Sequence, residues 1–389
     1  MDDEGTAGWP EPVVRVQSLS ESGLATIPAR YVKPESERPN TNPNKLVVTT
    51  KEEKGEEEGG EGDHHQTNKT KMSIPVVDLS SPRAPATARA VSAACREWGF
   101  FQAVNHGVSG ELLRRCRRVW KGFFHLPMEV KQRYGNSPAT YEGYGSRLGV
   151  EKGAVLDWGD YYFLHVRPPH LHDTDKWPHL PPDLRETTEE YSREVASLCG
   201  RLMAAMSAGL LVGAGGERRL AEAFGGEEAA GVCVRVNYYP RCPQPELTLG
   251  LSSHSDPGGM TVLLADDRVR GLQVRHRAGN WVTVDPVPGA LIVNVGDQIQ
   301  VLTNATYRSV EHRVMVNAEE ERLSVALFYN PRSDLPLAPM PELISPERPP
   351  LYKPMTFDEY RLYIRRKGPR GKSQVESLKA AAGDDDDGR

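Results

Sequence analysis

"TLGLSSHSDPGGMTVLLAD", residues 248–266, decides the fold class of this chain. It holds two short apolar runs separated by Pro-Gly-Gly, a punctuation that is typical of β-strands joined by a tight connection. The same pattern continues from about residue 233 to residue 331, with short β-rich runs at a spacing of about 8–12 residues. So many short strands favour an all-β sandwich or barrel, and a double-sheet jelly roll fits them.

Nine such runs follow one another: CVRVNYYP, TLGLSSHSD, MTVLLAD, GLQVRH, WVTVDPV, ALIVNVGD, IQVLTN, HRVMVNA and LSVALFYNP. We interpret the boundary between ALIVNVGD and IQVLTN, at Gly296-Asp297, as a turn that joins two strands. The sequence before residue 231 has a different character. Apolar residues recur there at helical spacing in residues 85–99, 109–127 and 193–214.

The pattern predicts an α+β fold: a double-stranded β-helix (jelly-roll) core with a helical N-terminal region and a C-terminal helix. That last helix, in residues 356–368, opens with Thr356 and Glu359 in a capping-box pattern. We expect six segments along the chain. They are an N-terminal extension (1–39), a disordered acidic insertion (40–72), a mostly helical region (73–230), the jelly-roll core (231–335), a C-terminal helical segment (336–379) and a disordered acidic tail (380–389).

Composition excludes several classes of protein. The net charge is only -5, so no broad nucleic-acid footprint is expected. No apolar run approaches the length of a membrane span, and the acidic N-terminus lacks the apolar core of a secretory signal. The five cysteines are scattered without a C-x-x-C, which indicates reduced thiols and a protein of the cytoplasm or nucleus. The sequence leaves the oligomeric state open.

Two residues of the opening stretch have the chemistry of metal ligands. His254 and Asp256 stand two apart near the end of a predicted strand, and period-2 geometry points both side chains to one face. His312 opens a later predicted strand. His-x-Asp followed by a distant His matches the 2-His-1-carboxylate triad, which binds Fe(II) and leaves positions open for substrate and O₂. A single histidine or aspartate is more often a packed or exposed residue than a metal ligand. The prediction of a metal site therefore depends on all three residues together.

Arg322 and Ser324 strengthen the prediction of a metal site. They alternate onto one face of another predicted strand, and a guanidinium beside a hydroxyl suits a carboxylate. A metal with open positions next to such an anchor describes a site for a chelating dicarboxylate such as 2-oxoglutarate.

These motifs, together with VNYYPRCPQPELTLGLSSHSD, NVGDQIQVLTNATYRSVEHR and WGFFQAVNHG, resemble the plant Fe(II)- and 2-oxoglutarate-dependent dioxygenases. The resemblance runs from residue 74 to about residue 378. Within that family, DPGGMTVLL, FYNPRSD and LYKPMTFDEYRLYIRRKGP are most similar to the jasmonate-induced oxygenases, which hydroxylate jasmonic acid. The resemblance implies Fe(II) as cofactor, 2-oxoglutarate and O₂ as cosubstrates, ascorbate as reductant, and control of jasmonate signalling by removal of the hormone.

It also implies residue roles. His254, Asp256 and His312 would bind iron, and Arg322, Ser324, Asn237 and Tyr239 would bind 2-oxoglutarate. The substrate carboxylate would be held by Arg235, Arg361 and Arg365, with Phe328 as a wall of the pocket. Two alternatives stay open at this point: Arg361 and Arg365 as the solvated face of a helix that pairs with Glu359, and Phe328 as a packed core residue.

Other functions also stay open. The same chemistry could oxidise another plant metabolite, such as a flavonoid or a butenolide hormone precursor. The chain could also be a catalytically silent protein that sequesters a small acid in its jelly-roll pocket. The intact triad and the Arg-x-Ser anchor speak against a silent binder, because pure binding needs no metal with open positions.

Overall fold

The computed structural model describes residues 13–39, 72–136, 142–146, 153–211, 216–368 and 371–379. The expected acidic tail lies outside the described residues, and so does the expected acidic insertion except for Met72.

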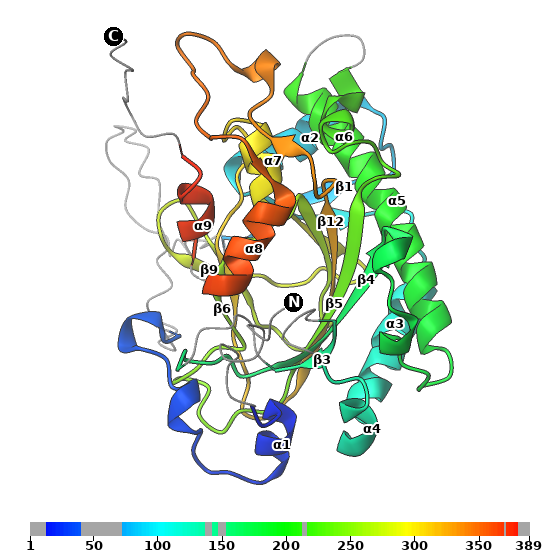
Figure 1. The fold of residues 1–389 in the computed structure, drawn as a ribbon, viewed down its shortest axis with the longest axis vertical. Helices are drawn as coiled ribbons and strands as arrows, with labels where there is room; N and C mark the ends of the chain where they lie inside the picture. Colours follow the sequence, from blue (N-terminus) through cyan, green and yellow to red (C-terminus); the bar gives the residue numbers. More distant parts are fainter. Residues whose placement is uncertain are drawn as a thin grey trace, which may run out of the picture.

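A large sheet forms the centre of the molecule (Figure 1). Its eight strands are, in spatial order, β1 (Val76–Asp78), β2 (Phe100–Val104), β10 (Leu291–Val295), β7 (Met260–Leu264), β12 (Arg322–Asn330), β5 (Gly231–Tyr239), β4 (Asp160–Arg167) and β3 (Gly143–Gly145). A smaller sheet has the order β6 (Leu251–His254), β11 (His312–Val314), β8 (Leu272–Arg275) and β9 (Trp281–Thr283). The two sheets make the double-stranded β-helix that the strand pattern predicted.

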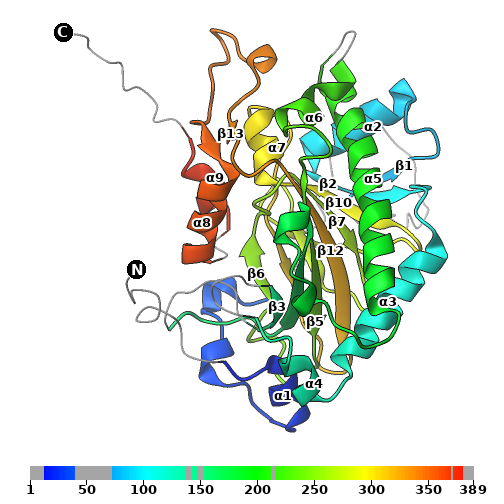
Figure 2. The same ribbon diagram turned by 45° about the vertical axis from the view of Figure 1, so that its right-hand side comes forward.

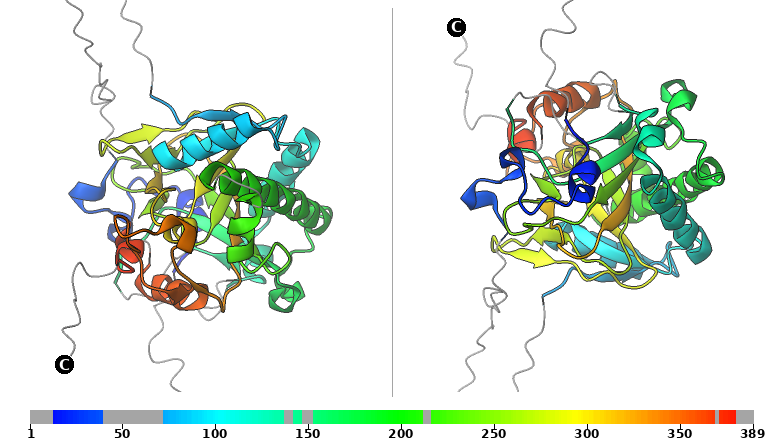
Figure 3. Two further views of the ribbon diagram at one scale, coloured as in Figure 1. Left: turned by 90° about the horizontal axis from the view of Figure 1, so that it is seen from above. Right: turned by 90° about the horizontal axis from the view of Figure 1, so that it is seen from below.

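Helices cover the outer face of the large sheet. The main ones are α2 (Pro85–Glu97), α3 (Gly110–Phe124), α5 (Leu184–Leu210) and α6 (Arg219–Ala223). Figure 3 shows α2 and α5 side by side on this face. Along β5, Val232, Val234 and Val236 are buried in the same apolar cluster as α5. Because side chains alternate along a strand, the residues between these valines must point to the interior of the β-helix. This alternation is what places Arg235 and Asn237 inside.

The remaining elements lie outside this helical layer. The α-helices are α1 (Val16–Glu21), α4 (Met128–Gln132), α7 (Asp297–Leu302), α8 (Phe357–Lys367) and α9 (Ser373–Glu376), and the last two strands are β13 (Pro336–Leu337) and β14 (Met355–Thr356). Thr356 and Glu359 make the predicted capping box, since each accepts from the other's backbone N–H. Figure 2 shows α8 and α9 beside β6, on the opposite side of the molecule from α5.

One predicted strand is wrong. IQVLTN does not form a strand: residues 297–302 are the helix α7, and Gly296-Asp297 is its start, not a hairpin turn. Every residue of α7 is buried, so the run carries no helical alternation of polar and apolar positions. The first turn is fixed by the Pro-Gly-Gly stretch, because Asp297 and Gln298 donate their backbone N–H groups to the carbonyls of Asp256 and Gly258.

Two strands of the N-terminal region were not predicted. β3 and β4 continue the large sheet beyond β5, and they lie inside the segment that the sequence marks as mostly helical. The long helix predicted over 193–214 is α5, which begins earlier, at Leu184. The boundary at residue 230 stays a prediction, and strands from both sides of it share one sheet. Within the described ranges, none of the helices combines the length and apolar character that crossing a bilayer requires.

Candidate metal and cosubstrate site

Strand pairing in the smaller sheet brings the two histidines together. His312 is the direct partner of His254 in the antiparallel pair of β11 and β6, and their ring centroids are 4.3 Å apart. Asp256 follows the end of β6 and places Oδ1 3.5 Å from His254 Nε2 and 3.6 Å from His312 Nε2. The three ligand atoms lie within 4.8 Å of one another. This arrangement has the donor set of one face of an octahedral Fe(II) site.

Backbone carbonyls orient both imidazoles. His254 Nδ1 lies 2.8 Å from the carbonyl of Ser252, and His312 Nδ1 lies 3.2 Å from that of Val310. A carbonyl can only accept, so each Nδ1 carries a proton, and Nε2 is the nitrogen left for a metal to bind. The structure therefore fixes the tautomer that a metal ligand needs.

Two polar side chains orient the carboxylate, and sequence reasoning missed both. Asp256 Oδ2 accepts a hydrogen bond from Thr261 Oγ1 on β7 at 2.5 Å and from Asn294 Nδ2 on β10 at 2.7 Å. Both donors are buried. They occupy one carboxylate oxygen and leave Oδ1 facing the imidazoles. The missed signal was their inward alternation on strands of the large sheet.

The electrostatics of Asp256 and His312 favour a ligating state, whereas the Asp256 carboxylate raises the pKa of His254 against the effect of burial, so a metal competes with a proton there. Burial alone would raise the pKa of Asp256, but the neighbouring imidazoles and Asn294 outweigh it and hold that pKa well below its usual range. Burial and the charge of His254 lower the pKa of His312 to about 4. At neutral pH the carboxylate is therefore ionised and His312 is neutral, as metal binding requires.

Arg322 and Ser324 lie on β12, opposite Tyr239 and Asn237 of β5. Arg322 is 4% exposed, and its Nε and Nη1 have no hydrogen-bond acceptor among the described residues. A buried guanidinium without an acceptor is costly, so this one fits an anion bound beside it. Gly271 allows the close approach, because a Cβ there would lie 2.9 Å from Arg322 Cδ and 3.0 Å from a backbone oxygen.

A cavity of about 760 Å³ opens beside these residues. Arg235, Asn237, Tyr239 and Tyr161 line it from the large sheet. Arg235 donates from Nε to Asn237 Oδ1 at 2.7 Å, and its guanidinium lies 4.2 Å from the centre of the Tyr161 ring. Burial lowers the pKa of Arg235, although the side chain remains a cation at neutral pH. The cavity thus holds a cation that belongs neither to the triad nor to the Arg322 anchor.

The N-terminal extension contributes to the same cavity, which no sequence motif indicated. Lys33 is 2% exposed, and its Nζ lies 2.7 Å from Asp157 Oδ1. Both residues line the cavity, and Ser252 Oγ donates to the same carboxylate at 2.6 Å. Because Ser252 belongs to β6, this bridge ties the extension to the strand that carries His254.

The other predicted substrate residues are placed less tightly. Arg361, on α8, is ion-paired with Asp358 at 2.8 Å, and its side chain is 46% exposed and does not line the described cavity. It still contributes, after burial, to lowering the pKa of His165 to about 4. Phe328 is half-buried on β12, opposite Cys233. Arg365 lies in α8, and its side chain is outside the described part of the chain.

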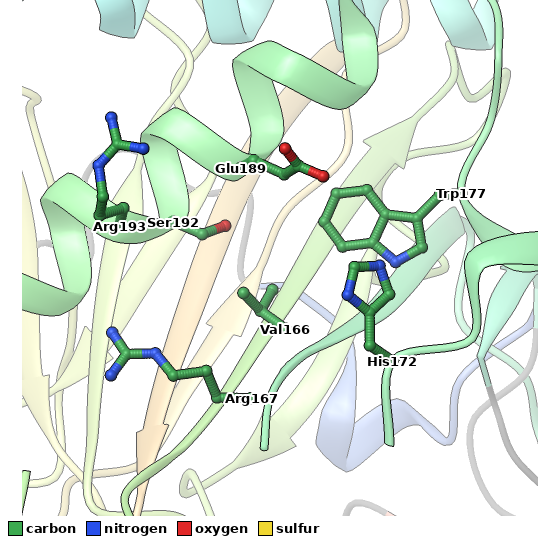
Figure 4. Close-up of a pocket in the computed structure, with 7 residues that line it drawn as sticks. All are labelled: Val166, Arg167, His172, Trp177, Glu189, Ser192 and Arg193. Carbon is green, nitrogen blue, oxygen red and sulfur yellow. The ribbon is translucent and has the colours of Figure 1, made fainter. Parts of the chain in front are cut away.

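A second cavity, of about 390 Å³, lies between α5 and the end of β4 (Figure 4). The rings of His172 and Trp177 face each other there with centroids 4.6 Å apart, while Arg167 and Arg193 stand on the other side. It contains none of the predicted site residues. The triad lines neither described cavity, but Ser252 and Ser253, which directly precede His254, line the first.

Comparisons with known proteins agree with this geometry. Residues 230–331 match the model of the 2OG-Fe(II) oxygenase superfamily, and residues 74–183 match that of the non-haem dioxygenase in morphine synthesis N-terminal family. Jasmonate-induced oxygenase 1 of Arabidopsis thaliana is 56% identical over 95% of this chain and 87% of its own length. Flavanone 3-dioxygenase 2 of Oryza sativa subsp. japonica is 42% identical over 88% and 92%.

Solved structures show the same fold. A crystal structure of JOX2 in complex with 2OG, Fe and JA is 54% identical, superposes with a TM-score of 0.84, and covers 96% of this chain and 99% of its own. The dioxygenase for auxin oxidation of rice is 28% identical, with a TM-score of 0.67 over 79% of this chain and 100% of its own.

Proposed function

We propose, from the premise that this chain belongs to the 2OG-Fe(II) oxygenase superfamily, that it hydroxylates jasmonic acid. Four jasmonate-induced oxygenases of Arabidopsis thaliana are 52–56% identical to it over 95–96% of its length. The protein is a 2-oxoglutarate-dependent dioxygenase that uses Fe(II), 2-oxoglutarate and O₂, with ascorbate as reductant. The reaction converts jasmonic acid, 2-oxoglutarate and O₂ into hydroxyjasmonate, succinate and CO₂, so it lowers the amount of jasmonic acid and restrains jasmonate signalling.

In this proposal His254, Asp256 and His312 hold the iron through the two Nε2 atoms and the Asp256 Oδ1 atom. Bound iron supplies the activation of O₂ that the oxidative decarboxylation of 2-oxoglutarate requires. Thr261 and Asn294 hold the unused carboxylate oxygen, so Asp256 presents a single oxygen to the metal. The triad then covers one face of the metal and leaves the opposite face open.

Arg322 and Ser324 bind the distal carboxylate of 2-oxoglutarate, and Tyr239 and Asn237 complete the walls of that pocket. The unpaired Nε and Nη1 of Arg322 support this role, because they provide two N–H donors in fixed geometry.

The observation that carries the substrate proposal is Arg235, a half-buried cation that lines the cavity and that the cosubstrate does not need. A small apolar acid such as jasmonic acid requires one fixed cation for its carboxylate and apolar walls for its body. We assign the carboxylate to Arg235 together with Arg361 and Arg365, and a wall to Phe328. The partner of this protein is thus a small molecule.

We also place the protein in the cytoplasm or nucleus. Its five cysteines are all free and buried in the structure, which suits a reducing compartment.

A panel assay tests the proposal. Purified protein is incubated with Fe(II), ascorbate and 2-oxoglutarate, and with either jasmonic acid or a flavanone as the second substrate. We expect jasmonic acid to gain one oxygen atom and succinate to form in step with it. Turnover of the flavanone without turnover of jasmonic acid would reassign the substrate. Tight binding of jasmonic acid without succinate would show a silent binder.

A further inference from the structure

Residues 371–379 contact the strand of the metal site directly. Gly371 donates its N–H to the carbonyl of Ser253 and accepts from the N–H of Ser255, so it pairs with β6 on either side of His254. Gly371 has a φ of +58°, and a Cβ there would meet the Glu311 carboxylate. Only glycine accommodates this close approach at low cost. The C-terminal segment is therefore seated on the metal strand itself.

Asp297 lies where this segment, α8 and the metal strand meet. It is 0% exposed, and its backbone N–H donates to the carbonyl of Asp256 at 2.8 Å. Its Oδ2 accepts from Tyr360 Oη of α8 at 2.6 Å and from Ser255 Oγ at 3.2 Å. Ser255 is the residue between His254 and Asp256 in the sequence. One buried carboxylate thus joins the helix that carries Arg361 to Ser255, the residue between two predicted iron ligands.

The next turn of α7 also contacts the C-terminal segment, through Gln300 and Val301. Gln300 donates to Tyr352 Oη at 2.8 Å and accepts from Lys372 Nζ at 3.1 Å. Val301, on the same helix, packs in an apolar cluster with Tyr352 and Tyr360, which also includes residues of α9. This apolar packing holds α7 and the C-terminal elements together as one unit. Three polar side chains of α7 are buried, and Asp297 is the one that joins Tyr360 of α8 to Ser255, whereas Gln298 bonds the carbonyl of Pro257.

We propose that Asp297 is a positioning residue that couples the seat of α8 to the geometry of the metal strand. Through Tyr360 it sets where Arg361 stands relative to the cavity, and through Ser255 it sets the backbone between His254 and Asp256. The inference rests on the proposed function for what Arg361 binds, but the contact that it names is independent of substrate. Loss of the Tyr360 bond should loosen α8 and leave the iron ligands in place.

Tyr360→Phe is the first test, because it deletes one hydroxyl and keeps the packed ring. In the metal-free protein we expect faster amide hydrogen exchange in peptides that cover residues 357–379. In the assay we expect the KM for jasmonic acid to rise roughly three- to tenfold, with the KM for 2-oxoglutarate unchanged. More succinate should form per hydroxyjasmonate, since the substrate is held less firmly.

Tyr352→Phe is the matched control. It removes a buried hydroxyl from the same segment but touches Gln300 instead of Asp297, so the KM for jasmonic acid should stay near the wild-type value. Asp297→Asn is a second variant, expected to weaken Fe(II) binding as well, because Asp297 also bonds Ser255. Weaker Fe(II) binding is measured by titration of the protein with the metal alone.

The outcomes separate the two proposals. Exchange and KM values of Tyr360→Phe that match the wild type, or an equal effect of Tyr352→Phe, would overturn the role of Asp297. If the wild type does not act on jasmonic acid, the proposed function fails, and the exchange and Fe(II) measurements still decide whether Asp297 couples the two elements.

Discussion

The metal end and the substrate end of the proposed site are built in different ways. At the metal end, His254, His312 and Arg322 come from strands whose pairing alone fixes their positions, and all are largely buried. At the substrate end, Arg235 comes from a strand, whereas Arg361 comes from a helix near the end of the chain and is half-exposed. The metal end is thus assembled by the core, and the substrate end only when the C-terminal segment has docked.

This difference suggests a division of labour. A rigid sheet suits Fe(II) and 2-oxoglutarate, whose binding demands fixed geometry. A docked helix is better suited to setting which acid is accepted, because its residues can change without disturbing the sheet. A substitution at one end that disturbed the function of both ends would contradict this division.

The largest effect is expected at the triad. His312→Ala should weaken Fe(II) binding by at least about 100-fold and abolish both succinate formation and hydroxylation, because a metal ligand is lost. Titration with Fe(II) measures the binding. Thr261→Val removes one of the two hydrogen bonds to the second oxygen of Asp256 and should weaken Fe(II) binding roughly tenfold. Turnover retained by His312→Ala would refute the triad.

The next effect concerns the cosubstrate. Arg322→Lys keeps the charge but loses the planar fork, so the KM for 2-oxoglutarate should rise roughly 10- to 100-fold while that for jasmonic acid changes little. Arg313→Lys is the control, since Arg313 is also a buried arginine but its guanidinium lies 4.3 Å from the centre of the Trp281 ring. Equal effects of the two substitutions would remove Arg322 from the 2-oxoglutarate site.

A smaller effect is expected at the substrate end. Arg361→Ala should raise the KM for jasmonic acid roughly tenfold, as expected for one charged contact, and leave substrate-free consumption of 2-oxoglutarate intact. Steady-state kinetics with both readouts measure the split. Arg332→Ala, an exposed arginine that pairs with Asp334, should change neither. If Arg361→Ala lowers both readouts equally, the arginine is structural.

The smallest effect is one of stability. Burial raises the pKa of Glu142 from its ordinary 4.5 to about 7, and its Oε1 accepts from the backbone N–H of His165. The folded state therefore holds a proton that the unfolded state has lost, so stability falls as pH rises from about 4.5 to 7. Glu142→Gln should remove this slope and raise the free energy of unfolding above pH 7 by about 1–3 kcal/mol.

Urea unfolding at a series of pH values checks this prediction. Glu228→Gln, at an exposed position, should follow the wild type throughout. A slope that survives in Glu142→Gln would assign the pH dependence to another group.

The sequence predicted the metal end better than the substrate end for a physical reason. Strand alternation is local, so His254, Asp256 and the Arg322-x-Ser324 pair could be assigned to interior faces from spacing alone. Thr261 and Asn294 obey the same rule but have no motif that sets them apart from ordinary polar residues.

Contacts between segments that are distant in the sequence could not be predicted from local sequence patterns. The Lys33–Asp157 bridge joins the N-terminal extension to the cavity, and nothing near either residue marks it. Asp297 was misread as a turn residue because α7 is buried on every side, which erases the helical period. Because α7 is buried on every side, its sequence did not indicate a helix, and so the linking role that we propose for Asp297 could not be predicted from it.

The most direct test of the account uses O₂ labelled with heavy oxygen. Wild-type protein with Fe(II), ascorbate, 2-oxoglutarate and jasmonic acid should place one labelled atom in succinate and one in hydroxyjasmonate, with the two products formed in equal amounts. Labelled succinate accompanied by unchanged jasmonic acid would contradict the account, because it would show a working metal end whose substrate is another molecule.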